Sequence, residues 1–334
     1  MTTIAFFNNK GGVGKITLLY HLAWMYSDLG LRVIAMDLDP QSNLSSMFLD
    51  EDRMDEIWNG YEDHESIDAA LRPLIGGTGD IADPHIEMIE DRLGLVVGSL
   101  ALAKTEDEFS SEWPKCLDQK ERAFRVISGF HRIVRKASAR FEADLVLLDV
   151  GPNLGALNRA ALIAADHIAV PLVPDLFSLQ GLRNLGPTLR EWRSGWKSRL
   201  AEAGKMSARL PELPSGGMEP CGYIVMQHAV RASRPTKAYD VWMKSIPGEY
   251  RESVLGESSI AEIPQPDPNC LAILKHYRSL MPMAMEARKP IFRLTPSDGA
   301  IGSHGVAVRD CHADFKRLAE ALALKCGVSL PSQR

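Results

Sequence analysis

A glycine-rich loop with the sequence NNKGGVGKIT, residues 8–17, constrains the fold of this chain more than any other feature. The run TIAFFN before it is rich in residues that favour strands. The run LLYHLAWMYSDLG after it has apolar positions at helical spacing until Gly30, and LRVIAMDLDP then reads as a second buried strand. Strand, glycine loop, helix and strand within about forty residues predict a βαβ unit with a right-handed crossover.

The residue types in this loop point to phosphate as the ligand. Backbone N–H groups at a helix N-terminus hold phosphate oxygens, and only glycine lets the backbone come that close. Lys15 would neutralise the β- and γ-phosphates as a point charge. The pattern departs from G-x-x-x-x-G-K-[ST], because Asn9 stands at the first glycine and Lys10 precedes the paired glycines. A glycine-rich turn without function is the alternative, and the position between a strand and a helix argues against it.

The rest of the chain repeats the alternation of buried strands and helices. We expect further strands at 93–97, 144–149, 167–174 and 221–227. We also expect a helix over about 119–139, a long basic helix after residue 178 interrupted near Pro187, and a closing helix at DFKRLAEALALKCGV. This alternation predicts an α/β fold with a mostly parallel twisted sheet and helices on both faces. Residues 1–330 would form a single nucleotide-binding domain.

Residues 51–140 interrupt this regular pattern. The chain carries 18 Asp/Glu against 6 Lys/Arg between positions 51 and 120, although its overall net charge is only −5. We interpret 51–140 as a helical acidic insertion within the domain. An acidic block beside a basic body fits a polyanion-binding face, and it fits chance equally well.

Composition limits the cellular setting. No apolar run reaches the roughly 18 residues that span a bilayer. The five cysteines are scattered and never form C-x-x-C, so we expect a cytoplasmic protein without a disulfide framework or a zinc site.

Four stretches, in order, resemble the ParA/MinD/Soj family of dimeric ATPases. The run K-G-G-V-G-K resembles the deviant Walker A of this P-loop NTPase family, and DLDPQ at 37–41 resembles its D-x-D-P-Q. DVGP at 149–152 resembles the Walker B and switch segment D-x-P-P. Residues 165–182 resemble the strand and helix that follow. The resemblance is good over 1–50 and 140–200, loose over 220–330 and poor over 51–140.

The resemblance implies a role for each matching residue. Lys15 would hold the phosphates of its own ATP, while Lys10 would reach across a dimer interface to the ATP of a second copy. Asp39 would help to position the attacking water. Asp149 would hold Mg²⁺ through water, with Asp37 beside it. The nucleotide-binding residues would be Gly11, Gly12, Val13, Gly14, Lys15, Ile16 and Thr17, and Gln227 and Pro264 are candidates for adenine recognition. Ordinary turn chemistry explains the last two equally well.

One departure from the family bears on catalysis. The family has Ser or Thr directly after the second lysine, where its hydroxyl ligates Mg²⁺, and this chain has Ile16. Thr17 is a poor substitute, because the next helical residue is rotated by about 100°. We therefore expect ATP binding with weak hydrolysis. Gly151 is a milder departure, since the family usually has proline there.

Basic residues suggest a partner. Arg183, Arg190, Arg193, Lys197 and Arg199 lie on or near one predicted helix with Trp192 and Trp196 interleaved, and Arg231, Arg234 and Lys237 form a second cluster. These residues could bind DNA without sequence preference. The alternative is a solvated helix face whose tryptophans pack inward.

The leading interpretation is a ParA-like protein that forms an ATP-dependent sandwich homodimer for partitioning DNA or positioning cargo. The resemblance also implies non-specific DNA and a ParB-like activator protein as partners. The alternative is a nucleotide-dependent binding switch without significant catalysis, with 51–140 as its partner surface. We expect no membrane binding, because no basic amphipathic helix follows the closing helix.

Overall fold

The computed structural model describes residues 1–59, 65–206, 210–226, 236–257, 264–277 and 279–331. Their strands form one sheet in the order β3-β4-β2-β5-β1-β6-β7-β8. The strands are β1 (Thr2–Phe6), β2 (Val33–Asp37), β3 (Glu87–Glu90), β4 (Leu93–Val96), β5 (Leu145–Asp149), β6 (His167–Leu172), β7 (Glu219–Met226) and β8 (Cys270–Leu274). All neighbouring pairs are parallel except β3 and β4. The predicted α/β class with a mostly parallel sheet is therefore confirmed.

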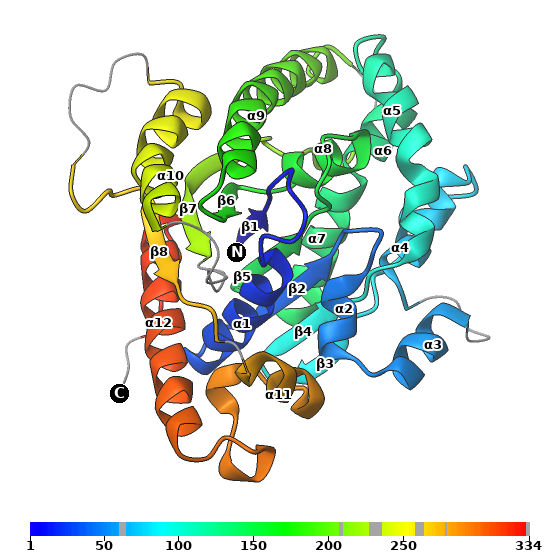
Figure 1. The fold of residues 1–334 in the computed structure, drawn as a ribbon. Coiled ribbons are helices and arrows are strands. Elements are labelled where there is room, and N and C mark those ends of the chain that lie inside the picture. Colours follow the sequence, from blue (N-terminus) through cyan, green and yellow to red (C-terminus); the bar gives the residue numbers. More distant parts are fainter. Residues whose placement is uncertain (60–64, 207–209, 227–235, 258–263, 278, 332–334) are drawn as a thin grey trace.

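Helices cover both faces of this sheet. They are α1 (Lys15–Asp28), α2 (Asn43–Phe48), α3 (Glu51–Asn59), α4 (Ile67–Ile75), α5 (Glu106–Lys115), α6 (Glu121–Ile127), α7 (Gly129–Phe141), α8 (Ala156–Ile163), α9 (Leu176–Ala203), α10 (Thr236–Glu249), α11 (Leu280–Ala287) and α12 (Ser303–Lys325). Short turns of other helix types are η1 (Leu100–Thr105), η2 (Tyr250–Leu255), η3 (Ile291–Arg293) and η4 (Pro296–Asp298). Figure 1 shows α4, α5 and α6 on one side of the molecule and α12 on the other.

Two apolar cores result from the strand alternation. In β5, Val146 and Leu148 join one core with α4 to α9, whereas Leu145 and Leu147 join the other with α1, α11 and α12. Successive side chains of a strand point to opposite faces, so both faces of a central strand must be apolar. The central strands are therefore near-continuous apolar runs in the sequence.

The register of the central strands positions the site. β5 lies between β2 and β1, and Asp149 is paired in register with Asp37 on one side and with Phe6 on the other. The carboxyl ends of three parallel strands therefore meet at one edge of the sheet. The glycine loop leaves β1 at that edge, as expected for a ligand site in a parallel α/β sheet.

Two helix predictions were wrong. The single helix expected at 119–139 is two helices, α6 and α7, which meet at Ser128. The expected interruption at Pro187 is absent, because α9 is one continuous helix of 28 residues that includes this proline. Its apolar side, including Leu185 and Leu189, is buried in the core. This burial offsets the hydrogen bond that a proline removes from a helix.

Residues 51–140 are part of the same sheet and core. They supply β3 and β4 as well as helices α3 to α7, and Phe124 and Phe130 are fully buried in the core that α4 to α9 share. In the described part of the chain, no helix is both long and apolar enough to cross a membrane.

Candidate functional site

The glycine loop ends in a helix that its own side chains do not cap. Gly12 and Gly14 have φ values of 73° and 86°, which side-chain-bearing residues rarely adopt. Gly14 is the N-cap of α1, with no side-chain cap hydrogen bond and no acidic residue in the first turn. An added Cβ at Gly11 or Gly12 would meet no described atom within 4 Å, so the loop is open on its outer side. The first N–H groups of α1 are thus available to an anion.

Lys15 reaches from the first turn of α1 to the end of β5. Its ammonium group donates hydrogen bonds to the Asp149 carboxylate and to the carbonyl of Val150. Lys15 is 8% exposed and Asp149 is fully buried. Burial raises the pKa of Asp149, and the neighbouring Lys15 opposes that rise. The predicted phosphate lysine and the predicted metal residue are therefore in direct contact, and phosphates would compete with Asp149 for the ammonium group.

Asp37 lies beside Asp149 and is held by backbone and hydroxyl donors. Its Oδ2 accepts hydrogen bonds of 2.8 Å from both the backbone N–H and the hydroxyl of Ser45, and its Oδ1 accepts one of 3.3 Å from the Asp39 N–H. Burial, followed by the charge of Asp149, raises the pKa of Asp37 to about 7. Asp37 thus fixes the start of α2 and the loop that carries Asp39.

Asp39 and the segment after β5 face each other. The Oδ1 of Asp39 accepts a hydrogen bond of 3.0 Å from the Gln41 N–H. An added Cβ at Gly151 would lie 3.4 Å from this oxygen and 3.4 Å from the amide group of Asn158. The backbone at Gly151 therefore passes between Asp39 and Asn158 with little room to spare.

The residues present fit a magnesium ion that arrives with a nucleotide. Asp149 Oδ2 is buried without a hydrogen-bond partner in the described structure. Within the described residues, no group of three or more His, Cys, Asp or Glu side chains is arranged to hold a metal ion. Mg²⁺ commonly takes one or two carboxylates, and phosphates and water complete its shell. An unpaired carboxylate oxygen beside Lys15, the predicted phosphate lysine, meets that requirement.

The two residues after Lys15 point to different surroundings. Ile16 is half-buried and packs against the apolar core under α1 and α12. Thr17 lines a pocket with Met226 and Leu274. The position where the family has a metal-ligating hydroxyl thus holds a packed hydrocarbon side chain in this chain.

Lys10 is held within its own chain. Its ammonium group forms an ion pair with Asp175 and lies 5.8 Å from the ring centre of Phe177. Burial alone would raise the pKa of Asp175, but hydrogen bonds from Lys10 and from the Ser178 N–H lower it below its usual value. The helix α9 also approaches the loop closely, because an added Cβ at Gly181 would lie 2.7 Å from the Asn9 side-chain oxygen.

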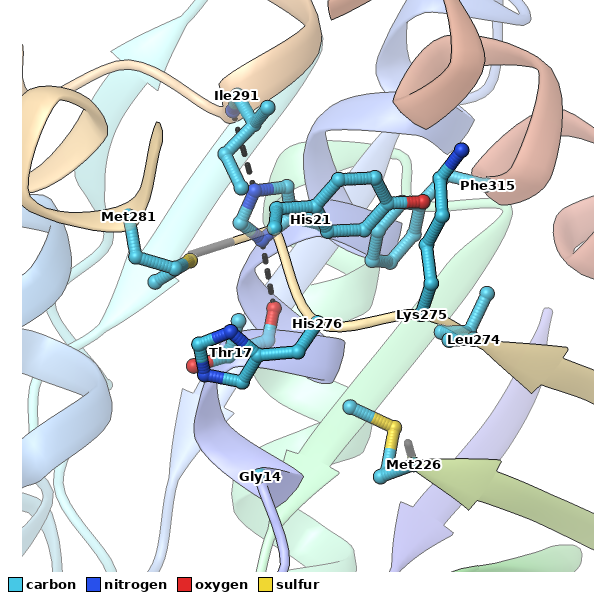
Figure 2. Close-up of a pocket in the computed structure, with 11 residues that line it drawn as sticks. Gly14, Thr17, His21, Met226, Leu274, Lys275, His276, Met281, Ile291 and Phe315 are labelled. Carbon is cyan, nitrogen blue, oxygen red and sulfur yellow. Dashed lines mark hydrogen bonds between the residues drawn. The ribbon is translucent and has the colours of Figure 1, made fainter. Parts of the chain in front are cut away.

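A pocket opens beside the first turn of α1. Its walls come from α1, the ends of β7 and β8, η3, α11 and α12, and they include Thr17, Met226, Leu274, His276 and Phe315. Figure 2 shows His276 beside Thr17, with Met226 near Gly14. The lining is mostly apolar with a few polar groups, which suits a flat heteroaromatic ring.

His21 forms the inner wall of this pocket. Its Nδ1 donates to the Thr17 carbonyl at 2.7 Å, and its Nε2 accepts from the Ile291 N–H at 3.1 Å (Figure 2). Burial lowers the pKa of His21 to about 4, and the hydrogen bond to Thr17 opposes this only in part. The ring is therefore neutral at pH 7.

The structure adds pocket residues that sequence reasoning missed. Gln227 lies outside the described residues, and Pro264 is exposed and is not among the residues that line this pocket. The residues that do line it include Leu274, which ends β8, and His276, which follows it. The apolar run CLAIL followed by polar residues is the sequence signal that could have indicated them.

Most arginines of α9 bind within the molecule. Arg190 and Arg193 donate to the carbonyls of Ser253 and Met218. Arg183 pairs with Glu249 at 2.7 Å. Trp192 and Trp196 pack inward, at 6% and 0% exposure, as the alternative of a solvated helix face requires. Arg231 and Arg234 lie outside the described residues.

Comparison with known proteins gives consistent matches. A family model described as "AAA domain" matches residues 1–201. The chromosome-partitioning ATPase Soj of Thermus thermophilus is 31% identical over 197 residues, which cover 59% of this chain and 65% of that protein. The chain spans between 42% and 66% of the length of the first curated relatives that it matches.

Solved structures match over nearly the whole chain. Protein DIP2308 from Corynebacterium diphtheriae has a TM-score of 0.72 at 24% identity, covering 97% of this chain and 98% of that one. A putative plasmid partition protein from Borrelia burgdorferi bound to AMPPNP has a TM-score of 0.59 at 15% identity, with 97% and 98% covered. At these identities the likeness shows the fold.

Proposed function

Because this chain belongs to the ParA/MinD/Soj family of P-loop ATPases, with the AAA domain of that family over residues 1–201, we propose that it binds ATP and forms an ATP-dependent dimer that positions DNA or another cargo. One observation carries the proposal. An uncapped helix N-terminus, a buried lysine–carboxylate pair and a pocket for a ring system lie side by side at one edge of the sheet.

The nucleotide would lie along the start of α1. Its phosphates would accept hydrogen bonds from the N–H groups of Gly11 to Thr17, and Lys15 would turn from Asp149 towards the β- and γ-phosphates. The base would enter the pocket between Met226, Leu274 and His276. Gly14 is common to the loop and the pocket, so one ligand can fill both.

Asp149 and Asp37 would serve the metal bound with ATP, which supplies charge neutralisation for phosphoryl transfer. The free Oδ2 of Asp149 would accept from a metal-bound water. Asp39, beside Gly151, would orient the attacking water. Hydrolysis would be slow, because Ile16 supplies no hydroxyl to the metal shell.

The surroundings of Lys10 support a dimer across the glycine loop. Apolar side chains at the start of α9 are exposed beside Lys10: Phe177 at 71% and Leu176 at 53%. A second copy facing this surface would cover them, which favours association. Lys10 would then leave Asp175 and contact the ATP of the partner.

A binding switch without significant catalysis is the second candidate, and Ile16 is the observation that favours it. The dimer would still form with ATP, but it would persist until ATP dissociates. Non-specific DNA and a ParB-like activator are proposed as partners on the strength of the family. Among the described α9 residues, Lys197 is the exposed basic group best placed to contact a phosphate backbone.

Nucleotide binding and dimer formation can be tested together. We would titrate a fluorescent ATP analogue with Mg²⁺ into the parent, Lys15→Ala, Lys10→Ala and the surface control Lys104→Ala, and follow mass by sedimentation velocity. We expect the parent and control to bind and dimerise, Lys10→Ala to bind without dimerising, and Lys15→Ala to do neither. A parent chain that does not bind at millimolar analogue would overturn the proposal.

Partner binding needs a separate measurement. Fluorescence anisotropy of a labelled duplex of arbitrary sequence, with and without ATP, should show binding at low salt that weakens steeply as salt rises. Lys197→Glu should weaken it, whereas Glu202→Gln near the end of the same helix should not. Equal affinity with and without ATP would contradict an ATP-gated DNA contact.

A further inference from the structure

Glu106, the first residue of α5, caps a helix that lies fifty residues further along the chain. Its two carboxylate oxygens accept hydrogen bonds from the first two N–H groups of α8, Ala156 at 2.6 Å and Leu157 at 2.9 Å. The N-cap of α8 is Gly155, which has no side chain to do so. An added Cβ at Gly155 would lie 2.7 Å from Glu106 Oε1. A carboxylate at this position also interacts favourably with the helix dipole.

The first turn of α8 in turn holds the segment that follows β5. Asn158 is 1% exposed, and its amide group donates to the carbonyls of Gly151 at 2.9 Å and Asn153 at 2.8 Å. The Asn153 side chain accepts from the Gly155 N–H at 2.8 Å. Residues 151–155 are thus tied to α8, and α8 is tied to Glu106.

The tied segment borders the proposed catalytic groups. The Val150 carbonyl accepts from Lys15, and Gly151 passes between Asn158 and Asp39. Glycine has the least conformational restriction of any residue, so Gly151 cannot fix the course of the chain by itself. The position of this backbone relative to Asp39 therefore depends on contacts made by its neighbours.

A second contact holds α8 against α5. The guanidinium of Arg159 lies 4.2 Å from the ring centre of Trp113, and that of Arg199 from α9 lies 3.7 Å from it. The indole of Trp113 therefore makes a cation–π contact with α8 and another with α9. With Glu106 at the start of α5 and Trp113 near its end, α8 is fixed at two points.

We propose that Glu106 is a positioning residue for ATP hydrolysis, acting through α8 and Asn158 on the backbone at 151–155. The proposal rests on the proposed ATPase function, and it gives the acidic block an indirect role at the site, through α8. The contacts of Glu106 are with the start of α8 and not with the residues proposed to hold the nucleotide, so its loss should slow the chemical step and leave ATP affinity unchanged.

The test compares Glu106→Ala, Glu106→Gln and the control Asp107→Asn, which removes a charge from an exposed neighbour in the same turn. Hydrogen exchange reports on the backbone at 150–158, and single-turnover conversion of labelled ATP, with protein in excess, reports on chemistry. We expect exchange at 150–158 to rise roughly fivefold in Glu106→Ala, less in Glu106→Gln, which keeps one acceptor, and not in the control. Exchange in α12 should stay unchanged.

The single-turnover rate should fall in the same order, with the dissociation constant of a fluorescent ATP analogue unchanged within about twofold. The rates are compared in the parent and in the Ile16→Thr chain, so that slow parental hydrolysis does not hide the effect. The positioning role would be overturned by unchanged exchange at 150–158. It would also be overturned if the affinity for the analogue fell by as large a factor as the single-turnover rate. If the parent does not bind the analogue, the proposed function is overturned. The exchange measurement then still decides whether Glu106 holds the backbone at 150–158.

Discussion

Lys10 and Asp175 form an ion pair that joins the glycine loop to the residue that caps α9. Asp175 uses one carboxylate oxygen for Lys10 and the other for the Ser178 N–H, at 2.9 Å. A lysine held by its own chain is not free to bind the nucleotide of another. The pair therefore opposes the dimer that we propose, and its strength should set how much protein is needed for dimerisation.

Asp175→Asn should lower the protein concentration at which ATP drives dimerisation. The amide keeps an acceptor for Ser178 but loses the charge that holds Lys10. A partly exposed ion pair contributes about 1 kcal/mol at most, and a dimer breaks one pair in each copy, so the midpoint should fall by up to roughly thirtyfold. Sedimentation at several protein concentrations measures it. Asp175→Ala is the comparison, because it loses the cap as well and should unfold about 1 kcal/mol more easily. A higher midpoint in Asp175→Asn would contradict the inference that the Lys10–Asp175 ion pair opposes dimerisation.

Ile16→Thr should raise Mg²⁺-dependent ATP turnover by tenfold or more, on the order expected for a regained metal ligand. Ile16→Val is the matched control, because valine and threonine differ only in the hydroxyl. Ile16→Val loses a methylene from a half-buried side chain and should unfold about 1 kcal/mol more easily. Ile16→Thr also exchanges a methyl group for a hydroxyl and should lose somewhat more stability. Turnover is measured by phosphate release at saturating ATP. Equal rates for the two variants would show that the hydroxyl is not what the site lacks.

Lys15→Met should destabilise the fold as well as remove the proposed phosphate lysine. It leaves Asp149 buried without its cation, which costs roughly 3 kcal/mol. The double variant Lys15→Met, Asp149→Asn should recover most of that loss, since no buried charge remains. Urea unfolding of the parent, the two single variants and the double variant gives the interaction free energy between Lys15 and Asp149. If the two losses simply add, the ion pair seen in the structure does not contribute to stability.

The position of the site was predictable because chain order and strand ends determine it. The glycine loop follows β1, and Asp37 and Asp149 end the two strands next in the sheet. Parallel strands bring their carboxyl ends to one edge, so residues that end buried strands converge there. The sequence pattern indicates these positions without any knowledge of side-chain contacts.

The side-chain contacts around the candidate site were not predictable in the same way. Lys10 meets Asp175 across 165 positions, and Glu106 meets Ala156 across 50. Such pairs depend on the angle at which one helix approaches another, and periodicity carries no information on that angle. Similarly, Pro187 predicts a break in an isolated helix, whereas burial of the apolar side of α9 overrides it.

His21 should make the protein lose stability between pH 6.5 and 4. Burial lowers its pKa to about 4 in the folded state, so the unfolded chain binds a proton over this range and the folded protein does not. The free energy of unfolding must then fall as the pH falls, by about 2 kcal/mol between pH 7 and pH 5 from this group.

His21→Gln cannot titrate but can still donate to the Thr17 carbonyl and accept from Ile291. Urea unfolding at pH 7 and pH 5 should show a smaller loss in His21→Gln than in the parent, whereas His304→Gln, at a partly exposed histidine, should behave as the parent does. An equal loss in the parent and in His21→Gln would mean that the ring is charged in its pocket, and a charged ring could not accept the hydrogen bond from Ile291 that fixes η3 against α1.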